Sequence, residues 1–236
     1  MALSSSVMSV VIVLIGIAFS LNMCVGTYDY LSLSLQWQPG YCRRTDIKIK
    51  CQNSLTVPNN FIIHGLWPSN HLDPQPEYCW TGDKQAQTLN TKTIPKDLQT
   101  KLKISWTSAI GDNEMFWKYE WSKHGTCYYD GKKHRQFTYF NTAYKFWNGF
   151  NLFNTLKAEG IVPVSGLGKQ YTTEAATKAI KKHYTKDTVT FTPRFMCSNS
   201  PPNELYEIIM CLDHDGMSAI NCTMPSSCGN LFLWKL

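Results

Sequence analysis

Leu31–Trp37 has the sequence LSLSLQW, in which apolar and polar residues alternate at every step. Successive side chains of a β-strand point to opposite faces of the sheet, so this period of two predicts a half-buried strand. Pro39 and Gly40 follow directly and predict its end. The segment indicates a fold built on a sheet with one apolar face.

Strand and helix patterns are mixed along the rest of the chain. Strands are predicted at Phe61–His64 (a central strand ending before Pro68), Thr188–Phe191 and Glu204–Leu212. Helices are predicted from Pro95 through Leu98, Leu102 and Trp106, over Phe116–His124, from Phe140 to Leu156 with an end near Gly160, and over Ala175–Tyr184. Residues 69–94 lack periodicity and predict an exposed loop region. The absence of βαβ alternation favours an α+β class, as one domain with a mainly antiparallel central sheet flanked by several helices.

The first 26 residues form a compositionally distinct segment. They contain no charged side chain, and Val7–Leu21 is almost wholly apolar. This run is shorter than the ~20 residues of a membrane span, so residues 1–26 are interpreted as a secretory signal peptide, with a membrane anchor as the alternative. We expect a secreted domain over residues 27–236, with no membrane attachment after cleavage.

The cysteine count agrees with cleavage. Removing Cys24 from the nine cysteines leaves eight, an even set that indicates four disulfides in an oxidising compartment. A zinc site is the alternative, but no CxxC pair is present. Spacing alone does not choose among the about 105 possible pairings.

Two surface properties follow from composition. The formal net charge of +6 suits a polyanionic partner without establishing one. Asn221-Cys222-Thr223 is an N-x-S/T acceptor, which on a secreted chain predicts a surface glycan or remains an unused site.

Phe116–Cys127, with the sequence FWKYEWSKHGTC, concentrates reactive side chains on a predicted helix. Residues three and four apart share a helix face, so Glu120, Lys123 and His124 lie on neighbouring parts of one surface. Gly125 is expected to end this helix, with Cys127 fixing its end covalently. The alternative is an ordinary solvated helix face.

Phe61–Pro68, with the sequence FIIHGLWP, places a second histidine in an apolar setting. Such a histidine is often a hydrogen-bonded core residue. However, Gly-Leu-Trp-Pro follows His64 and predicts that the chain turns out of the sheet there, which puts His64 at an edge.

These two segments resemble the two active-site segments of the ribonuclease T2 family, (F/I)-I-H-G-L-W-P and W-x-x-E-W-x-K-H-G-T-C, in the same order. The resemblance extends over most of the mature chain, including the strand from Leu31 to Trp37. Within that family the chain looks most like the plant S-RNases, the pistil proteins of self-incompatibility. The implied disulfides are Cys42–Cys51, Cys79–Cys127, Cys197–Cys228 and Cys211–Cys222.

The resemblance implies an endoribonuclease that cleaves single-stranded RNA through 2′,3′-cyclic phosphates, without metal or other cofactor. His124 would be the general base and His64 the general acid, giving a bell-shaped pH profile. Lys123 would neutralise charge on the phosphorane, and Glu120 would stabilise the imidazolium or polarise the phosphate.

Substrate-binding residues are implied as well. Trp67 would be a stacking platform for a base, with a buried core role as the alternative. Tyr119 stands where many members of the family carry a third histidine that helps to bind phosphate. Ser69 stands where some carry an acidic residue for base recognition, which leaves base preference open.

The biological role has three interpretations. An S-RNase would act in the extracellular matrix of the style as a monomer, with pollen F-box proteins as partners. An S-like ribonuclease would serve phosphate recycling or defence. A catalytically inactive storage or binding protein on the same fold is the third. His71, His134 and His183 are interpreted as surface residues, with guidance of the RNA backbone as the alternative for His134, which lies in the basic turn Lys132–Arg135. Asp213–Gly216 is interpreted as a polar turn and not a metal loop.

Overall fold

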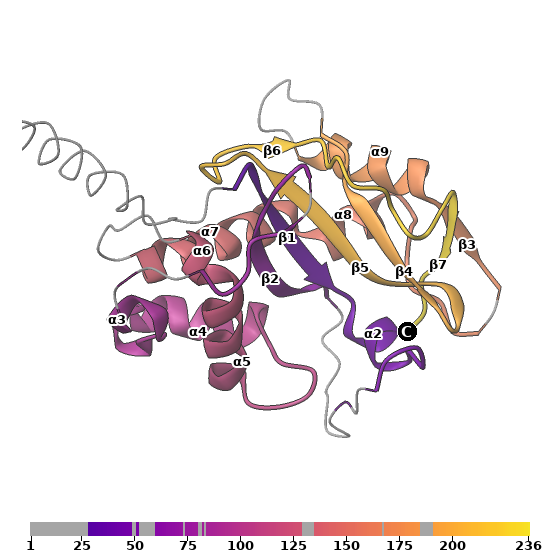
Figure 1. Cartoon of the computed structure of the whole chain (residues 1–236). Coiled ribbons are helices and arrows are strands. Elements are labelled where there is room, and N and C mark those ends of the chain that lie inside the picture. Colours follow the sequence, from indigo (N-terminus) through magenta and orange to yellow (C-terminus); the bar gives the residue numbers. More distant parts are fainter. Residues whose placement is uncertain are drawn as a thin grey trace, which may run out of the picture.

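The structure is a computed structural model, which describes residues 28–48, 51, 60–72, 74–79, 82, 84–128, 135–166, 168–184 and 191–236 (Figure 1). The expected signal peptide and His134 lie outside the described residues, as do residues 188–190 of one expected strand. Phe191, the last residue of that expected strand, is buried but belongs to no strand.

One sheet unites the strands of the described part of the chain. Its members are β1 (Tyr30–Gln36), β2 (Ile62–Ser69), β3 (Gln170–Thr172), β4 (Arg194–Asn199), β5 (Pro202–Leu212), β6 (Ala219–Ile220) and β7 (Leu231–Leu233). The order is β2-β1-β5-β7-β3, and β4 and β6 also pair with β5. Only the β5–β7 pairing among these is parallel. The predicted α+β fold with a mainly antiparallel sheet is confirmed.

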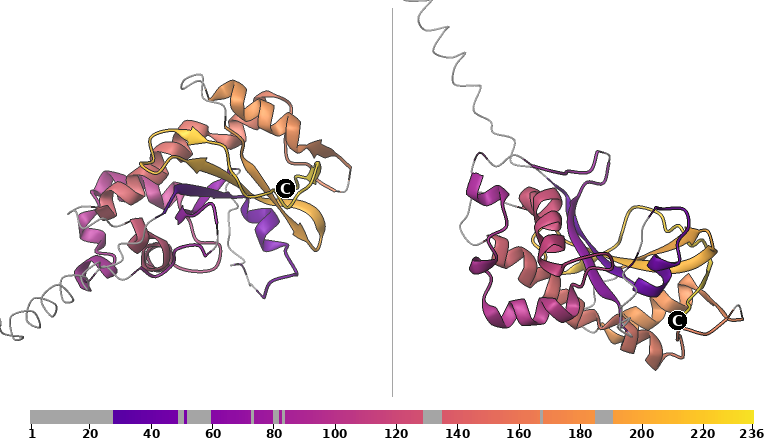
Figure 2. Two further views of the ribbon diagram at one scale, coloured as in Figure 1. Left: turned by 45° about the horizontal axis from the view of Figure 1, so that its top comes forward. Right: turned by 90° about the horizontal axis from the view of Figure 1, so that it is seen from below.

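Some helices pack on the sheet, and others form a group beside one end of it. They are α2 (Gln38–Cys42), α3 (Lys84–Gln87), η1 (Thr91–Thr93), α4 (Lys96–Ser105), α5 (Asn113–Glu120), the π-helical turn η2 (Trp121–Gly125), α6 (Thr126–Tyr128), α7 (Arg135–Phe150), α8 (Leu152–Ala158) and α9 (Thr173–His183). Figure 2 shows α3 to α6 gathered beside β1 and β2, with α9 toward the opposite end of the sheet. The helix α7 packs against both β2 and α4, which joins the two parts into one core.

The first strand is more deeply placed than its alternation predicts. All seven residues of β1 are buried, because the strand lies between β2 and β5. Its leucines enter the main core, while its polar face is also covered. There the hydroxyl of Ser69 donates to that of Ser32 across 3.0 Å. The half-buried prediction was therefore wrong about the polar face.

The strand that carries His64 is an edge strand, not a central one. It does not end before Pro68 but continues through Ser69, with Pro68 opposite Leu31. Proline is tolerated there because an edge strand has no neighbour on its other side to receive a hydrogen bond. The edge position expected for His64 is thus correct, but the chain does not turn out of the sheet at Gly65.

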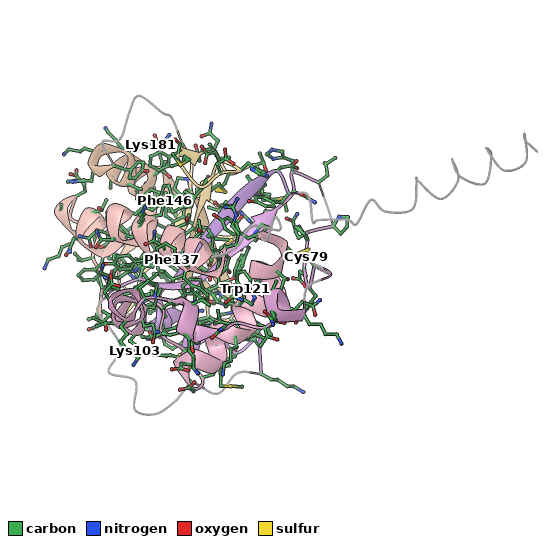
Figure 3. All side chains as sticks on the ribbon, turned by 90° about the vertical axis from the view of Figure 1, so that its left-hand side faces the viewer. Cys79, Lys103, Trp121, Phe137, Phe146 and Lys181 are labelled. Atoms are coloured by element: carbon green, nitrogen blue, oxygen red, sulfur yellow. A yellow bond between two sulfur atoms is a disulfide. The ribbon has the colours of Figure 1, made fainter. Side chains whose placement is uncertain are left out.

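Three further expectations need correction. The long helix predicted from Phe140 to Leu156 is two helices, α7 and α8, because Asn151 between them has a positive φ of 41°. Gly125 does not end its helix, which continues into α6. Residues 69–94 include α3 and η1, and Leu89 and Ile94 from this region are buried in the core. Figure 3 shows Trp121 lying among the helical side chains, with Lys103 and Lys181 at the periphery.

Candidate active site

His64 occupies an irregular position in its strand. Ser34 of β1 pairs with Gly65, and the next residue, Leu35, pairs with Ile63, so His64 is an extra residue without a partner in β1. Such a β-bulge bends the strand and changes the direction of a side chain. The carbonyl of His64 accepts a hydrogen bond from the indole of buried Trp106 at 2.9 Å. The bulge therefore lets the strand present both His64 and Trp67 to the same site.

His124 lies on the π-helical turn η2. Asp112 caps the preceding helix α5 by accepting from the amide of Met115. A π turn inserts an extra residue into a helix and is frequent at functional sites. The indole of buried Trp121 donates to the carbonyl of Ala86 at 2.8 Å, which anchors the turn. A Cβ at Gly125 would overlap the ring of Trp121, so glycine is needed here for close packing and not as a helix end.

The indole of Trp67 lies against both imidazoles. Its ring centroid is 5.1 Å from that of His64 and 5.4 Å from that of His124. Its Nε1 donates to Oε2 of Glu120 at 3.0 Å. The structure therefore brings together four predicted residues that come from two segments separated by more than fifty positions.

These side chains line one cleft of about 300 Å³. Its lining residues are His64, Trp67, Pro68, Ser69, Gln75, Pro76, Glu77, Tyr119, Glu120, Lys123 and His124. All six residues predicted to act on the substrate are in this set. The volume is at the lower end for ligand sites, so it suits part of a nucleotide and not a folded nucleic acid.

The environment of His64 favours its protonated form. Its side chain is 26% exposed, and Nδ1 lies 2.6 Å from Oε1 of Glu207. Burial by itself lowers the pKa of His64, but the charge and hydrogen bond of Glu207 outweigh it, so the pKa is raised above 6.5. This imidazole is suited to start a reaction as a proton donor.

The environment of His124 has the opposite effect. Burial, followed by the positive charges of Lys123 and His64, lowers the pKa of His124 to about 3. Its Nδ1 is buried, and no described group forms a hydrogen bond with it. No hydrogen bond in the described structure therefore holds a proton on Nδ1, and the neutral ring can accept one.

Glu120 and Lys123 place two further ionisable groups beside the imidazoles. Burial raises the pKa of Glu120 to about 6, against the opposing effects of His64, the Trp67 hydrogen bond and Lys123. Partial burial would lower the pKa of Lys123, but its hydrogen bond to Glu77 raises it overall. Lys123 Nζ lies 3.1 Å from Oε1 of Glu77. The ammonium is thus charged, with a carboxylate beside it at the mouth of the cleft.

Glu207 and Glu77 were not identified by sequence reasoning. Glu207 had a signal, because a carboxylate within the hydrophobic strand Glu204–Leu212 requires a partner. Glu77 had none, since it lies in a polar segment without periodicity.

The remaining predicted residues divide between cleft and surface. Tyr119 is 49% exposed and lines the cleft, with Lys123 Nζ 5.9 Å from its ring centroid. His71, His183 and His214 have carboxylate, hydroxyl or aromatic neighbours away from the cleft. Asp213 accepts from two backbone amides and forms the expected polar turn. Within the described residues no cluster of potential metal ligands is found.

The four disulfides implied by the family resemblance are all present: Cys42–Cys51, Cys79–Cys127, Cys197–Cys228 and Cys211–Cys222. The second one fixes the segment that carries Glu77 to the helix that carries His124. Asn221 is exposed, and its side-chain oxygen accepts from Thr192.

Comparison with known proteins identifies relatives that match almost the whole described chain. The sequence model of the Ribonuclease T2 family matches residues 28–222. Ribonuclease S-7 of Nicotiana alata is 31% identical over 96% of this chain and 94% of its own length. Ribonuclease 1 of Arabidopsis thaliana is 32% identical over 89% of this chain and 87% of its own. The crystal structure of RNase NT in complex with 5′-AMP superposes with a TM-score of 0.71 at 27% identity, over 89% of this chain and 98% of that one. None of the described helices combines the length and apolar character that a bilayer crossing requires.

Proposed function

The chain belongs to the ribonuclease T2 family, and on that premise we propose that it cleaves single-stranded RNA by acid–base transphosphorylation in the cleft between His64 and His124. The observation that carries this proposal is the placement of both imidazoles against one indole, with an ammonium and a carboxyl group beside them. Activity as a ribonuclease follows from the family; the assignment of roles to residues is our proposal.

The chemistry needs two proton transfers in opposite directions. RNA carries its own nucleophile, the 2′-hydroxyl, so an enzyme has to remove that proton and protonate the leaving 5′-oxygen. His124 is the general base, because its low pKa keeps the ring neutral. His64 is the general acid, because Glu207 favours its protonated form. The products are a 2′,3′-cyclic phosphate and a free 5′-hydroxyl.

The other two polar groups act on the phosphorane. The Lys123 ammonium neutralises the negative charge that develops on the phosphorane oxygens. Glu120, with a pKa of about 6, is partly protonated in mildly acidic solution and can then donate to a phosphate oxygen. In its ionised form it stabilises the His64 imidazolium instead. Both roles use the position that the Trp67 indole gives to its carboxyl group.

Single-stranded RNA fits the cleft better than a duplex. Trp67 is only partly buried and reaches the cleft, so it is available to stack on an unpaired base. Stacking contributes about 1–3 kcal/mol per base and requires bases that are free of a partner strand. Tyr119 adds a second aromatic ring at the mouth of the cleft.

An RNA-cleavage assay tests the proposal. His64→Ala and His124→Ala are each expected to lower kcat/KM on a ribo-oligonucleotide by at least about 10²-fold. His183→Ala, outside the cleft, is the control and should cleave like the wild type. Mass spectrometry should detect a terminal 2′,3′-cyclic phosphate, and a 2′-deoxy substrate should stay intact. Cleavage of the deoxy substrate, or full activity in either alanine variant, would refute the mechanism.

For the biological role we propose an S-RNase of gametophytic self-incompatibility, secreted into the style. The support is the positive charge and the similarity to Ribonuclease S-7. The similarity to Ribonuclease 1 supports the S-like alternative, in phosphate recycling or defence. Transcripts restricted to the style, with allelic variation concentrated in residues 69–94, would favour the first. Expression in phosphate-starved or infected tissue would exclude it. An inactive storage protein would show no effect of His64→Ala.

Three subsidiary proposals accompany this role. Residues 1–26 are removed as a signal peptide, which N-terminal sequencing of the mature protein tests. Asn221 carries a glycan on its exposed side chain, which a mass shift on glycosidase treatment tests. Pollen F-box proteins bind the monomer through exposed loops, which co-purification from pollen extract tests.

A further inference from the structure

Glu207 is a buried carboxylate on the strand β5. The residue is 5% exposed, and its backbone pairs with Gln36 of β1 and Met196 of β4. From this position deep in the sheet its side chain reaches across to the edge strand, where Oε1 lies 2.6 Å from Nδ1 of His64. The two residues are 143 positions apart in sequence, so only the fold brings them together.

A carboxylate in such a place has a strong energetic requirement. Removing an ionised carboxyl group from water costs several kcal/mol unless a charged or hydrogen-bonding partner compensates. At 2.6 Å the contact is short, as charge-assisted hydrogen bonds are, and such bonds are roughly twice as strong as neutral ones. Protonated His64 is therefore the natural partner of ionised Glu207.

We propose that Glu207 is a positioning residue for His64: it accepts a hydrogen bond from Nδ1–H, which fixes the ring, commits Nδ1 and leaves Nε2 to deliver the proton to the leaving oxygen. This inference deepens the proposed function and rests on it for the role of His64. The carboxylate acts through the imidazole and does not contact the substrate.

The geometry supports the assignment from two directions. His64 lies on a β-bulge, so its ring orientation is not set by a regular strand pairing, and a second contact has to fix it. The edge of the Trp67 indole and the ring of Phe116, at 6.0 Å, confine the imidazole on its faces. The hydrogen bond to Glu207 fixes the remaining freedom, which is rotation of the imidazole about the Cβ–Cγ bond of His64.

Other ionisable groups also act on this imidazole or on its carboxylate. Those that act on the pair from neighbouring elements are Tyr41 of α2, Glu120 of α5, Lys123 and His124 of η2, Arg194 of β4 and Tyr206 of β5. All of them remain when Glu207 alone is changed. A difference between wild type and a Glu207 variant therefore isolates the contribution of this one carboxylate.

The first measurement is an NMR titration of His64, assigned by its loss in His64→Gln. Glu207→Gln keeps the size of the side chain and removes its charge, so the midpoint should move to lower pH. Glu159→Gln is a matched control, because Glu159 lies 2.9 Å from Nε2 of His183 on the distant helix α9, and it should leave the His64 titration unchanged. An unchanged midpoint in Glu207→Gln would overturn the proposal, whether or not the chain cleaves RNA.

The second measurement is the pH dependence of kcat/KM on a ribo-oligonucleotide. In Glu207→Gln the basic limb should move to lower pH while the acidic limb stays in place, because only the general acid has lost its stabiliser. On that limb, each pH unit of displacement lowers the rate about tenfold. A uniform loss at every pH, with both limbs fixed, would indicate a merely structural role and overturn the proposal.

A third measurement needs no variant and so does not depend on the folding of one. Nitrogen-15 chemical shifts of neutral His64 in the wild-type protein distinguish its two tautomers. The proposal requires the proton on Nδ1, and a predominant Nε2–H form would overturn it. If instead the chain proved unable to cleave RNA while the NMR results held, the proposed function would fail and the Glu207–His64 coupling would stand.

Discussion

Replacing Gly65 with alanine is expected to disrupt the active site while leaving the chain folded. A Cβ at this position would lie closer than 3.0 Å to Nε1 of Trp67 and to Oε2 of Glu120, where ordinary contacts begin at 3.4 Å. Both atoms belong to side chains, so the backbone of β2 can stay in place while the indole and the carboxyl group separate. The hydrogen bond between them is the contact that is lost.

The size of both effects follows from that contact. A hydrogen bond to a charged group contributes about 1.5–3 kcal/mol to stability, so the free energy of unfolding should fall by about that amount. A displacement of about 1 Å in a catalytic group costs about 10²-fold in rate, which corresponds to about 2.7 kcal/mol of transition-state stabilisation. We therefore expect a folded variant whose kcat/KM is about 10²-fold lower.

The assay pairs urea unfolding with steady-state cleavage of a ribo-oligonucleotide. Gly149→Ala is the matched control, since a Cβ there meets nothing within 4 Å and the residue lies inside the helix α7. It should gain about 0.5–1 kcal/mol in stability and keep full activity. A folded Gly65→Ala enzyme with wild-type kcat/KM would refute the reasoning, because the two site residues would then have moved without consequence.

Three further predictions concern pH, charge and covalent linkage. Between pH 6.5 and about 3 the unfolded chain binds a proton at His124 that the folded chain excludes, so the free energy of unfolding falls as the pH is lowered through this range. In His124→Gln that fall should be smaller, which urea unfolding at pH 4.5 and at pH 7.5 measures. Glu77→Gln releases the ammonium of Lys123 for substrate phosphate, so KM for RNA should fall at low salt with little change in kcat. Removing Cys79–Cys127, with a separation of 48 residues, should lower the free energy of unfolding by about 4 kcal/mol.

Each of these three has its own comparison. The control for Glu77→Gln is Asp97→Asn, which breaks an exposed ion pair with Lys101 outside the cleft and should leave KM unchanged. The comparison for Cys79–Cys127 is removal of Cys42–Cys51, with a separation of 9 residues, which should lower the free energy of unfolding by only about 2.5 kcal/mol. An acid-side decline identical in His124→Gln and wild type would contradict the first prediction. An unchanged KM in Glu77→Gln would contradict the second prediction. Equal losses of unfolding free energy on removal of the two disulfides would contradict the third.

The local patterns that predicted elements correctly are those with a period matched to the backbone. The alternation in Leu31–Trp37 predicted β1, and the helical spacing of Leu98, Leu102 and Trp106 predicted α4. These patterns work because side chains alternate every two residues in a strand and repeat every 3.6 in a helix. The break at Asn151 was missed, because an isolated left-handed residue leaves the surrounding helical pattern intact.

The site was predicted residue by residue from its two segments, and the structure brings those residues into one cleft. What the segments could not give is their geometry. The bulge at His64 arises from the register between β1 and β2, and the turn η2 depends on how Trp121 packs against Gly125 and the carbonyl of Ala86. Neither register nor packing is a property of a single segment.

The sequence by itself determined the chemical groups: two imidazoles, an ammonium, a carboxyl group and an indole, carried on a sheet edge and a helix. Only the tertiary structure decided that the imidazoles differ, with Glu207 stabilising a proton on His64 while burial and the ammonium of Lys123 disfavour one on His124. The physical reason is that a pKa depends on burial and on charges within a few ångströms. Those neighbours come from parts of the chain as far apart as 143 residues, and folding alone brings them together.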